Sequence, residues 1–194
     1  MISVLKNMLS QNKRLQEIHK IEGHFGLNEG RLLCKLTKLL KDDSVIVEIG
    51  AFKGKSTCFI AEGIGNKDIR FYTIDTWYND QMPQGRGDVY DDFLKNIRGY
   101  RDKIEPLRGY SYEVVQNWPK ERKIDFLWID GDHSYEGVSQ DIADWFPLLK
   151  KGSIVAFHDY RDAPGVKKAV DDLVVQGRLK KMTTEGCIFA GKYL

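Results

Sequence analysis

Polar residues that can hold a ligand or carry a proton follow five short apolar segments of this chain. They are Glu48 with Gly50, Asp75, Gly109 with Ser111, Asp130 to His133, and His158 with Asp159. The carboxyl ends of parallel strands meet at one edge of a sheet, and sheets of this kind bind their ligands there. Carboxylates accept hydrogen bonds and bind cations, and histidine exchanges protons near neutral pH. The pattern therefore predicts one polar site built from several strand ends.

The stretch Val45–Thr57, VIVEIGAFKGKST, contains the turn that opens this site. Its apolar start predicts a buried strand, its glycines a tight turn, and the residues after Gly54 a helix whose first amide groups face a ligand. A dinucleotide turn needs G-x-G-x-x-G, which is absent. Gly54-Lys55-Ser56 fits the end of a phosphate-binding loop, but Gly50 stands one position too close. Glu48, two residues before Gly50, is typical of S-adenosylmethionine (SAM) binding, and an ordinary strand-to-helix turn also fits.

Asp75 ends the next apolar strand, about 25 residues after Gly50. A carboxylate at this position accepts hydrogen bonds from the hydroxyl groups of a ribose, for which a phosphate-binding loop has no use. Asp75 could also simply start the loop that follows it. Asp130, after the apolar segment 124–129, fits the acidic residue of a nucleoside triphosphatase. Asp75 favours a nucleoside ligand, and the phosphate-loop interpretation stays open.

Length and composition predict one globular domain with a substantial core, since the chain has 194 residues of which 42% are hydrophobic and 30% charged. The net charge of +2 gives no basis for a nucleic-acid or polybasic membrane surface. Cys34, Cys58 and Cys187 lack disulfide or metal-ligand spacing, which indicates reduced side chains. No stretch has the length of a membrane span, and the N-terminus has no signal-peptide apolar block. We therefore expect a cytoplasmic protein with no nucleic-acid partner and no membrane contact.

Strand-like and helix-like periods alternate along the chain. Strands are predicted at residues 45–49, 69–75, 104–107, 124–129 and 153–157, with helices between them. Asn28 is expected to cap a helix that ends near Leu40, and Gly152 to end the helix that begins after Ser134. Residues 179–183 and 187–192 predict a final hairpin. This order predicts an α/β fold, with a doubly wound, mostly parallel sheet, helices on both faces and an antiparallel C-terminal hairpin.

Four segments together resemble a known family. VEIGAFKGKST, FYTIDTW, IDFLWIDGDHSYEGV, and LLKKGS with IVAFHDY look like the class I SAM-dependent methyltransferases in order and spacing. The resemblance is closest to the small-molecule O-methyltransferase branch, which includes antibiotic and sugar tailoring enzymes, some of them metal-dependent. It covers about Asp43 to Tyr160 and implies a Rossmann-like seven-stranded sheet. Residues 1–41 would then form an N-terminal helical cap, and residues 42–194 the SAM-binding methyltransferase domain.

The resemblance also implies which part of the cofactor each strand end binds. The amino-acid end of SAM lies after the first strand, its ribose after the second and its adenine after the third. Asp75 would bind the ribose, with Trp77 as a shield. The cofactor-binding residues implied in this way are Glu48, Gly50, Ala51, Phe52, Ser56, Asp75, Trp77, Gly109, Ser111, Tyr112 and Asp130.

The same resemblance implies catalytic and metal-binding roles for the last two clusters. Catechol-type relatives have a lysine base three residues after the carboxylate at the position of Asp130, and this chain has His133 there. Metal-dependent members hold Mg²⁺ at the positions of Asp130, His158 and Asp159. A histidine departs from the all-oxygen set that Mg²⁺ prefers, so Mn²⁺, Fe²⁺ or Zn²⁺ would fit equally, and Asp132 is an alternative ligand. Asp130 and His133 are therefore the predicted catalytic residues.

The leading hypothesis is a SAM-dependent O-methyltransferase that acts on a small hydroxylated molecule. His133 would be the general base, with assistance from a divalent metal. The loop Trp77–Asp92 and the N-terminal helices would cover the substrate, and these helices could also join two copies as a homodimer. Two alternatives stay open. One is a P-loop-like NTP-binding protein that depends on Lys55, and the other is a non-catalytic SAM-binding module.

Overall fold

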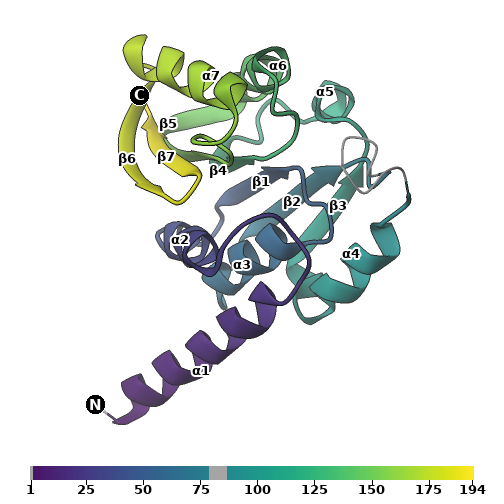
Figure 1. Ribbon diagram of the computed structural model, residues 1–194, viewed down its shortest axis with the longest axis vertical. Coiled ribbons are helices and arrows are strands. Elements are labelled where there is room, and N and C mark those ends of the chain that lie inside the picture. The colour runs from purple at the N-terminus through teal and green to yellow at the C-terminus, as the bar shows by residue number, and fades with distance from the viewer. Residues whose placement is uncertain (1, 79–86) are drawn as a thin grey trace.

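The computed structural model describes residues 2–78 and 87–194, and within these ranges seven strands form one sheet in the order β3-β2-β1-β4-β5-β7-β6 (Figure 1). Strands β1 to β5 pair in parallel, and β7 runs antiparallel to both β5 and β6. The predicted α/β fold, mostly parallel with an antiparallel C-terminal hairpin, is confirmed. The strand bounds are β1 Val45–Ile49, β2 Arg70–Asp75, β3 Ile104–Arg108, β4 Ile124–Ile129, β5 Leu149–Phe157, β6 Leu179–Glu185 and β7 Ile188–Tyr193.

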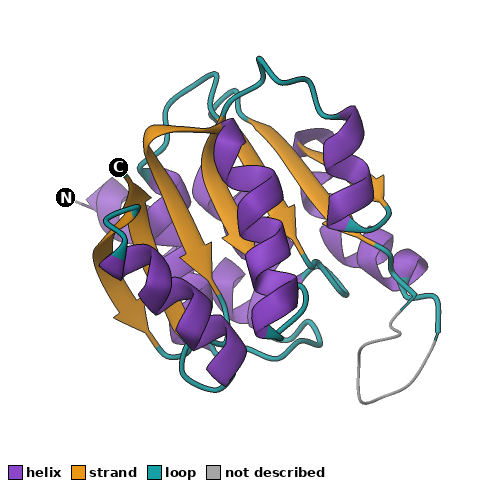
Figure 2. Ribbon diagram, turned by 90° about the horizontal axis from the view of Figure 1, so that it is seen from above, coloured by secondary structure: helices purple, strands orange, loops and turns teal. Residues whose placement is uncertain are grey.

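Helices cover both faces of the sheet, as the views in Figures 1 and 2 show. One layer holds α1 Ile2–His19, α2 Leu27–Lys38, α3 Lys55–Ile64 and α4 Tyr90–Asn96. The other layer holds α5 Ser111–Val114, α6 Tyr135–Trp145 and α7 Pro164–Val175. Short 3₁₀ segments continue three of the helices, namely η1 Ile97–Lys103, η2 Val115–Asn117 and η3 Phe146–Leu148.

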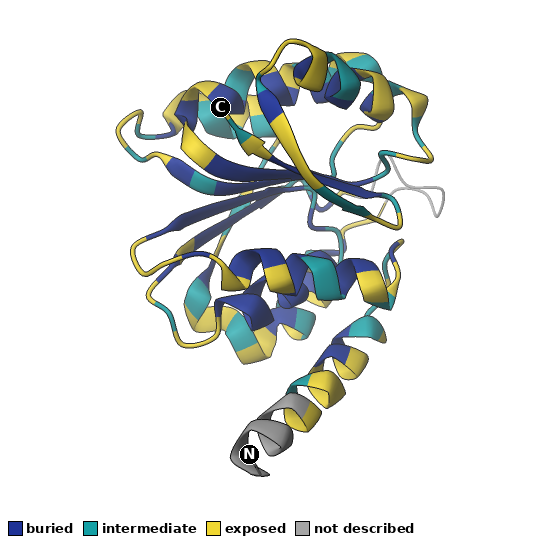
Figure 3. Ribbon diagram, turned by 90° about the vertical axis from the view of Figure 1, so that its left-hand side faces the viewer, coloured by how far each residue is buried: buried dark blue, intermediate teal, exposed yellow. Residues whose placement is uncertain are grey.

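The central strands β1 and β4 are buried on both sides, which explains their nearly continuous apolar sequences. Successive side chains of a strand point to opposite faces. Ile46 and Phe126 therefore join the core under α2 and α3, whereas Val47 and Leu127 join the core under α6 and α7. Figure 3 shows this arrangement as a buried sheet between two half-exposed helical layers.

Two predicted helix ends were wrong, each for a local reason. Helix α2 is capped at Gly26 rather than at Asn28, because the Glu29 carboxylate accepts a hydrogen bond of 2.6 Å from the Gly26 amide. Ser134 does cap α6, and its hydroxyl accepts from the Gly137 amide at 3.0 Å. This helix ends at Trp145 instead of Gly152, since the sequence FPL that follows forms η3 and leads directly into β5.

The N-terminal helices differ in how far they belong to the core. Helix α2 packs closely on α3, and its Leu33 lies in the same buried cluster as Phe59. Helix α1 projects from the body of the protein (Figures 1 and 3), and Leu15 and Ile18 near its C-terminal end are buried. Among the described residues, no helix combines the length and the apolar character needed to cross a bilayer. Residues 79–86, the middle of the loop predicted to cover the substrate, lie outside the described residues.

Candidate active site

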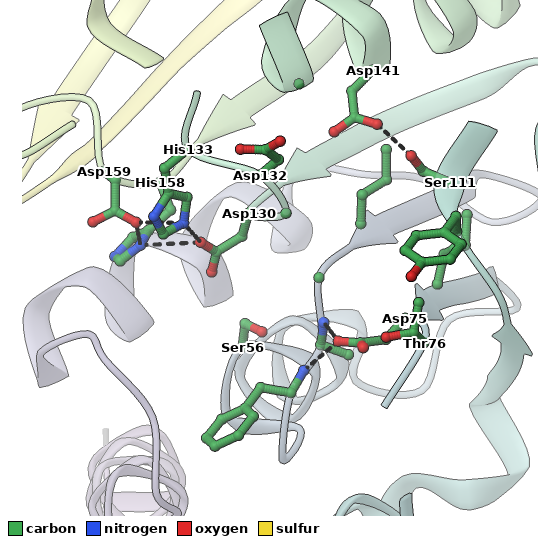
Figure 4. Close-up of a pocket in the computed structure, with 18 of the residues that line it drawn as sticks. Ser56, Asp75, Thr76, Ser111, Asp130, Asp132, His133, Asp141, His158 and Asp159 are labelled. Carbon is green, nitrogen blue, oxygen red and sulfur yellow. Dashed lines mark hydrogen bonds and ion pairs between the residues drawn. The ribbon is translucent and has the colours of Figure 1, made fainter. Parts of the chain in front are cut away.

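A cavity of about 830 Å³ opens where the carboxyl ends of β1 to β5 meet. Figure 4 shows its labelled polar side chains as one group around Asp130, another around Asp75, and the pair Ser111–Asp141. The strand ends named from the sequence thus meet in one place. The predicted site residues that line the cavity are Gly50, Ala51, Phe52, Ser56, Asp75, Gly109, Ser111, Tyr112, Asp130, His133, His158 and Asp159. Glu48 and Trp77 are not among its lining residues.

The glycine turn after β1 brings the backbones of two strands into contact. Gly50 has φ +84°, and a Cβ atom there would overlap the carbonyl oxygen of Asp130. Gly54 also has φ +84°, and its amide donates to the carbonyl of Ala51 at 2.7 Å. Only glycine combines this backbone conformation with so close an approach. The turn therefore fixes the floor of the cavity between β1 and β4.

Glu48 is fully buried, and its carboxylate accepts hydrogen bonds from three hydroxyl groups. The donors are Ser56 Oγ at 2.6 Å, Thr57 Oγ1 at 2.7 Å and Thr73 Oγ1 at 2.8 Å. Burial raises the pKa of Glu48 to about 7, although the three hydroxyls favour its charged form. These bonds join β1, β2 and the start of α3, so the side chain supports the turn from behind.

Asp75 connects the turns that follow β1 and β2. Its Oδ2 accepts from the amides of Ala51 and Phe52, both at 2.8 Å, and its Oδ1 accepts from the Trp77 amide at 2.7 Å. A carboxylate offers about four acceptor positions, so about one remains for a ligand. Trp77 itself is fully buried against Tyr90, with ring centroids 4.7 Å apart, and anchors this turn.

Asp141 on α6 was not predicted from the sequence, although it lines the same cavity. The Ser111 hydroxyl donates to its carboxylate, and burial raises the pKa of Asp141 to about 6. Ser134, Gly137 and Asp141 all line the cavity and recur at helical spacing. This spacing could have indicated Asp141 as a site residue from the sequence. It was not recognised, because the apolar residues of the same helix dominate its pattern.

The polar group around Asp130 consists of two aspartates and two histidines. His158 Nδ1 lies 3.2 Å from Asp130 Oδ1 and 3.0 Å from Asp159 Oδ2. His133 Nε2 lies 3.1 Å from the same Asp159 oxygen and 3.8 Å from Asp130 Oδ1. The His158 side chain is only 4% exposed, whereas that of His133 is 53% exposed. Both histidines thus contact the same two carboxylates. His158 contacts them from inside the protein, and His133 from the cavity.

These contacts set the charges of the group. Burial would lower the pKa of His158, but Asp130 and Asp159 raise it to about 11. Burial would likewise raise the pKa of Asp130, but the charges of His158 and His133 lower it. The pKa of His133 is raised, first by Asp130 and then by Asp159.

Asp130, His133 and Asp159 form a candidate cation-binding group, because their ligand atoms all lie within 4.8 Å of one another. His158, which the sequence placed in the metal site, is not part of this group. A protonated Nδ1 donates a hydrogen bond and has no lone pair for a metal ion. Two carboxylates and one imidazole suit Mn²⁺, Fe²⁺ or Zn²⁺ better than Mg²⁺.

The loop between α1 and α2 forms a wall of the cavity, inside the segment 1–41 that the sequence predicted as a cap, although none of its residues was named as a site residue. Glu22 to Phe25 line the cavity, and the Phe25 ring centroid lies 5.8 Å from that of His158. Glu22 Oε2 pairs with Lys53 Nζ at 2.7 Å, which ties the loop to the glycine turn. No sequence pattern in residues 20–26 indicates that this loop lines the cavity, because its position depends on how α1 and α2 pack.

Comparisons with known proteins agree with this geometry. Residues 47–160 match a family described as a methyltransferase domain. Uncharacterized protein R132 of Acanthamoeba polyphaga mimivirus is 31% identical over 163 residues, which are 79% of this chain. The matched part spans 64% of that relative's length.

Solved structures of similar fold include two O-methyltransferases with ligands. The enzyme from Bacillus cereus, in complex with S-adenosylhomocysteine (SAH), has a TM-score of 0.66 at 18% identity, covering 94% of this chain and 90% of that one. TomG from Streptomyces achromogenes, which is involved in tomaymycin synthesis and was solved with SAM, has a TM-score of 0.67 at 17% identity, covering 93% and 89%. The chain therefore belongs to the methyltransferase-domain family and has the class I SAM-dependent methyltransferase fold, as the sequence resemblance implied.

Proposed function

We propose that this protein is a SAM-dependent methyltransferase that transfers a methyl group to a hydroxyl of a small molecule. One observation carries the proposal: a nucleoside-type end, with Asp75 and Ser111, and an acid–base group, with Asp130 and His133, line the same cavity. Methyl transfer requires the donor and the acceptor to be aligned in one site from which water is excluded. A cavity of about 830 Å³ lies within the usual size range of small-molecule sites.

The cofactor would lie along the strand ends in the order implied by the sequence. The backbone of Gly50 to Phe52 faces its amino-acid end, Asp75 offers its remaining acceptor position to a ribose hydroxyl, and Ser111 marks the adenine end. Asp141 and Tyr112 complete that end of the cavity. Glu48 acts through the hydroxyls that it holds at the start of α3, and Trp77 acts by anchoring the turn after β2. Both are positioning residues in this account.

His133 is the proposed general base. Its Nε2 borders the cavity and is oriented by Asp159 at 3.1 Å. When bound, SAM supplies a methyl carbon on a positively charged sulfur. His133 takes the hydroxyl proton of the acceptor as its oxygen bonds to that carbon, and the electrons of the breaking C–S bond stay on sulfur, leaving SAH. The buried Nδ1 of His158 contacts both carboxylates and helps to keep them in place beneath the base.

Divalent-metal assistance is a second element of the proposal. Asp130, His133 and Asp159 have the donor set for a transition-metal ion, which would lower the pKa of an acceptor hydroxyl. A metal held by His133 Nε2 would occupy the lone pair that a base needs, so this residue cannot serve both roles at once. Turnover that survives a strong chelator and is not stimulated by Mn²⁺ or Mg²⁺ would assign His133 to proton transfer.

The phosphate-loop alternative has a specific argument against it. In such a loop, free backbone amides face the phosphate. Here the amides of Ala51 and Phe52 already donate to the Asp75 carboxylate, whose negative charge would repel a phosphate. A thermal-shift comparison separates the two ligands: we expect stabilisation by SAM and SAH and none by ATP with Mg²⁺.

Turnover tests the remaining alternative, a SAM-binding module without catalysis. A panel of hydroxylated sugars, phenols and acidic metabolites is incubated with the protein and SAM, and products with one added methyl group are detected by mass spectrometry. We expect SAH to form together with a methylated member of the panel. Tight SAH binding without any product would favour the non-catalytic module, and absence of SAM and SAH binding would reject the whole proposal.

Three further predictions from the sequence remain part of this proposal. The N-terminal segment 1–41 acts as a cap, which is supported by the wall that Glu22 to Phe25 form. The N-terminal helices join two copies as a homodimer, which sedimentation of the purified protein tests. All three cysteines are free, in agreement with a reducing compartment such as the cytoplasm.

A further inference from the structure

Lys55, the first residue of α3, has no part in the function proposed above. It is only 6% exposed and lines the cavity. Its ammonium donates to the carbonyl oxygen of Gly23 at 3.2 Å. Within the described part of the chain, no carboxylate lies close enough to form an ion pair with it. An ammonium has three donors, so Lys55 retains capacity to bind an anion from the cavity.

The position of this cation is well defined. A Cβ atom on Gly23 would lie 2.9 Å from Lys55 Cδ, so the side-chain stem packs directly on the backbone of the α1–α2 loop. The Nζ atom lies 5.6 Å from the centroid of the Phe25 ring. Burial lowers the pKa of Lys55, and the more distant charge of Glu29 offsets this only in part. A bound anion would stabilise an ammonium held in such surroundings.

The start of α3 adds amide donors at the same place. The helix has ten residues, and its N-cap is Gly54, which has no side chain to accept from the first amide groups. Those amides have no acceptor within a helix, and the helix dipole favours negative charge beside them. The Ser56 hydroxyl is bonded to Glu48 and does not compete for them. A buried cation and a free helix start thus border one end of the cavity, which suits a carboxylate.

The path of the cofactor identifies which carboxylate this is. With adenine near Ser111 and ribose at Asp75, the amino-acid end of SAM passes Gly50 and reaches the start of α3. We propose that Lys55 binds the α-carboxylate of SAM. This inference rests on the proposed function and deepens it. It also gives the Gly54-Lys55-Ser56 motif a carboxylate to bind in place of a phosphate.

The test compares SAM with decarboxylated SAM, which keeps the amine and the sulfonium but lacks the carboxylate. Calorimetric titration gives the Kd of each ligand for the wild-type protein, Lys55→Met and Lys55→Arg. A charge-assisted hydrogen bond corresponds to a factor of about 10 to 100 in affinity. We expect the wild type to prefer SAM by about this factor, Lys55→Met to lose the preference while binding decarboxylated SAM normally, and Lys55→Arg to keep part of it.

Lys53→Met is the matched control, because Lys53 Nζ pairs with Glu22 and Asp92 instead of facing the cofactor. It loosens the same loop, and we expect it to leave the ratio of the two affinities unchanged. If Lys55→Met keeps the wild-type ratio, or weakens both ligands equally, the assignment of Lys55 is overturned while SAM binding stands. If the wild type binds neither ligand, both this inference and the proposed function fail.

Discussion

The two ends of the cavity are held together by different kinds of interaction. At the nucleoside end, backbone amides and hydroxyl groups hold Asp75 and Glu48 in place, and close backbone contact at Gly50 fixes the turn. At the acid–base end, two aspartates and two histidines hold one another by charge, with contacts between 3.0 and 3.8 Å. The nucleoside end is therefore defined by backbone conformation, and the acid–base end by the protonation states of its side chains.

This difference indicates how each end responds to change. A substitution that alters backbone shape at the nucleoside end should affect folding and cofactor binding together. A substitution that alters charge at the acid–base end should affect turnover and its dependence on pH, with little effect on cofactor affinity. The four predictions below test this division, beginning with the largest expected effect.

Gly50→Ala should break the nucleoside end. The added Cβ would overlap the Asp130 carbonyl, and alanine at φ +84° is strained, so we expect a loss of about 3 kcal/mol or more in stability. SAH binding should become undetectable by calorimetry. Gly99→Ala is the matched control, because a Cβ there meets nothing within 4 Å. Wild-type SAH affinity in Gly50→Ala would show that this turn does not shape the cofactor site.

His133→Gln should break the acid–base end alone. The variant keeps a polar side chain but cannot take a proton near neutral pH, so turnover with an acceptor from the panel should fall by about 10² to 10⁴. Its SAH affinity should stay within about twofold of the wild type, since His133 is half exposed and supports no backbone turn. A parallel loss of affinity and turnover would demote His133 to a structural role.

Asp159→Asn should shift the pH dependence of turnover. A general base works as neutral imidazole, and Asp130 and Asp159 raise the pKa of His133. Turnover should therefore increase with pH through a midpoint above the ordinary pKa of histidine. Removing one carboxylate lowers the pKa of His133, so the midpoint in Asp159→Asn should move to lower pH. Asp144→Asn, at a half-buried position of α6 that does not line the cavity, should leave the profile unchanged, and an unshifted profile in Asp159→Asn would contradict this account.

Glu48→Gln should change how stability depends on pH, the smallest of these effects. Burial raises the pKa of Glu48 from 4.5 to about 7, so its contribution to stability is complete below about pH 4.5 and is lost as pH rises through about 7. Between about pH 5 and pH 8, denaturant unfolding of the wild type should therefore lose about 2 kcal/mol more than that of Glu48→Gln. Glu105→Gln on β3 is exposed and should behave as the wild type. Equal losses in Glu48→Gln and the wild type would mean that Glu48 is already ionised at low pH.

Local patterns allowed the sheet and most of the strand ends to be predicted from the sequence. β1 and β4 are buried on both faces, so their apolar runs are unmistakable, and Gly50 marks the turn that only glycine permits. The orientation of Glu48 was also available in principle. It lies two residues after Ile46 and so points to the same face, toward α3 and away from the cavity.

Other parts of the site depend on packing that no local pattern records. The wall formed by Glu22 to Phe25 exists only because α1 and α2 bring that loop over the strand ends. The state of His158 likewise depends on three acidic side chains from separate elements, since Glu29 Oε1 also lies 3.8 Å from its Nε2. The resemblance implied a metal ligand, whereas in the fold the carboxylates of Asp130 and Asp159 hold this side chain and raise its pKa.

Glu29 joins two segments that are far apart in the chain. Its carboxylate accepts from the Gly26 amide at the start of α2 and from the Cys187 amide in the turn before β7, 158 residues later. The second bond requires the C-terminal hairpin, in which β7 lies between β5 and β6. A chain without the hairpin would therefore lack this link at the start of α2, next to the loop that lines the cavity.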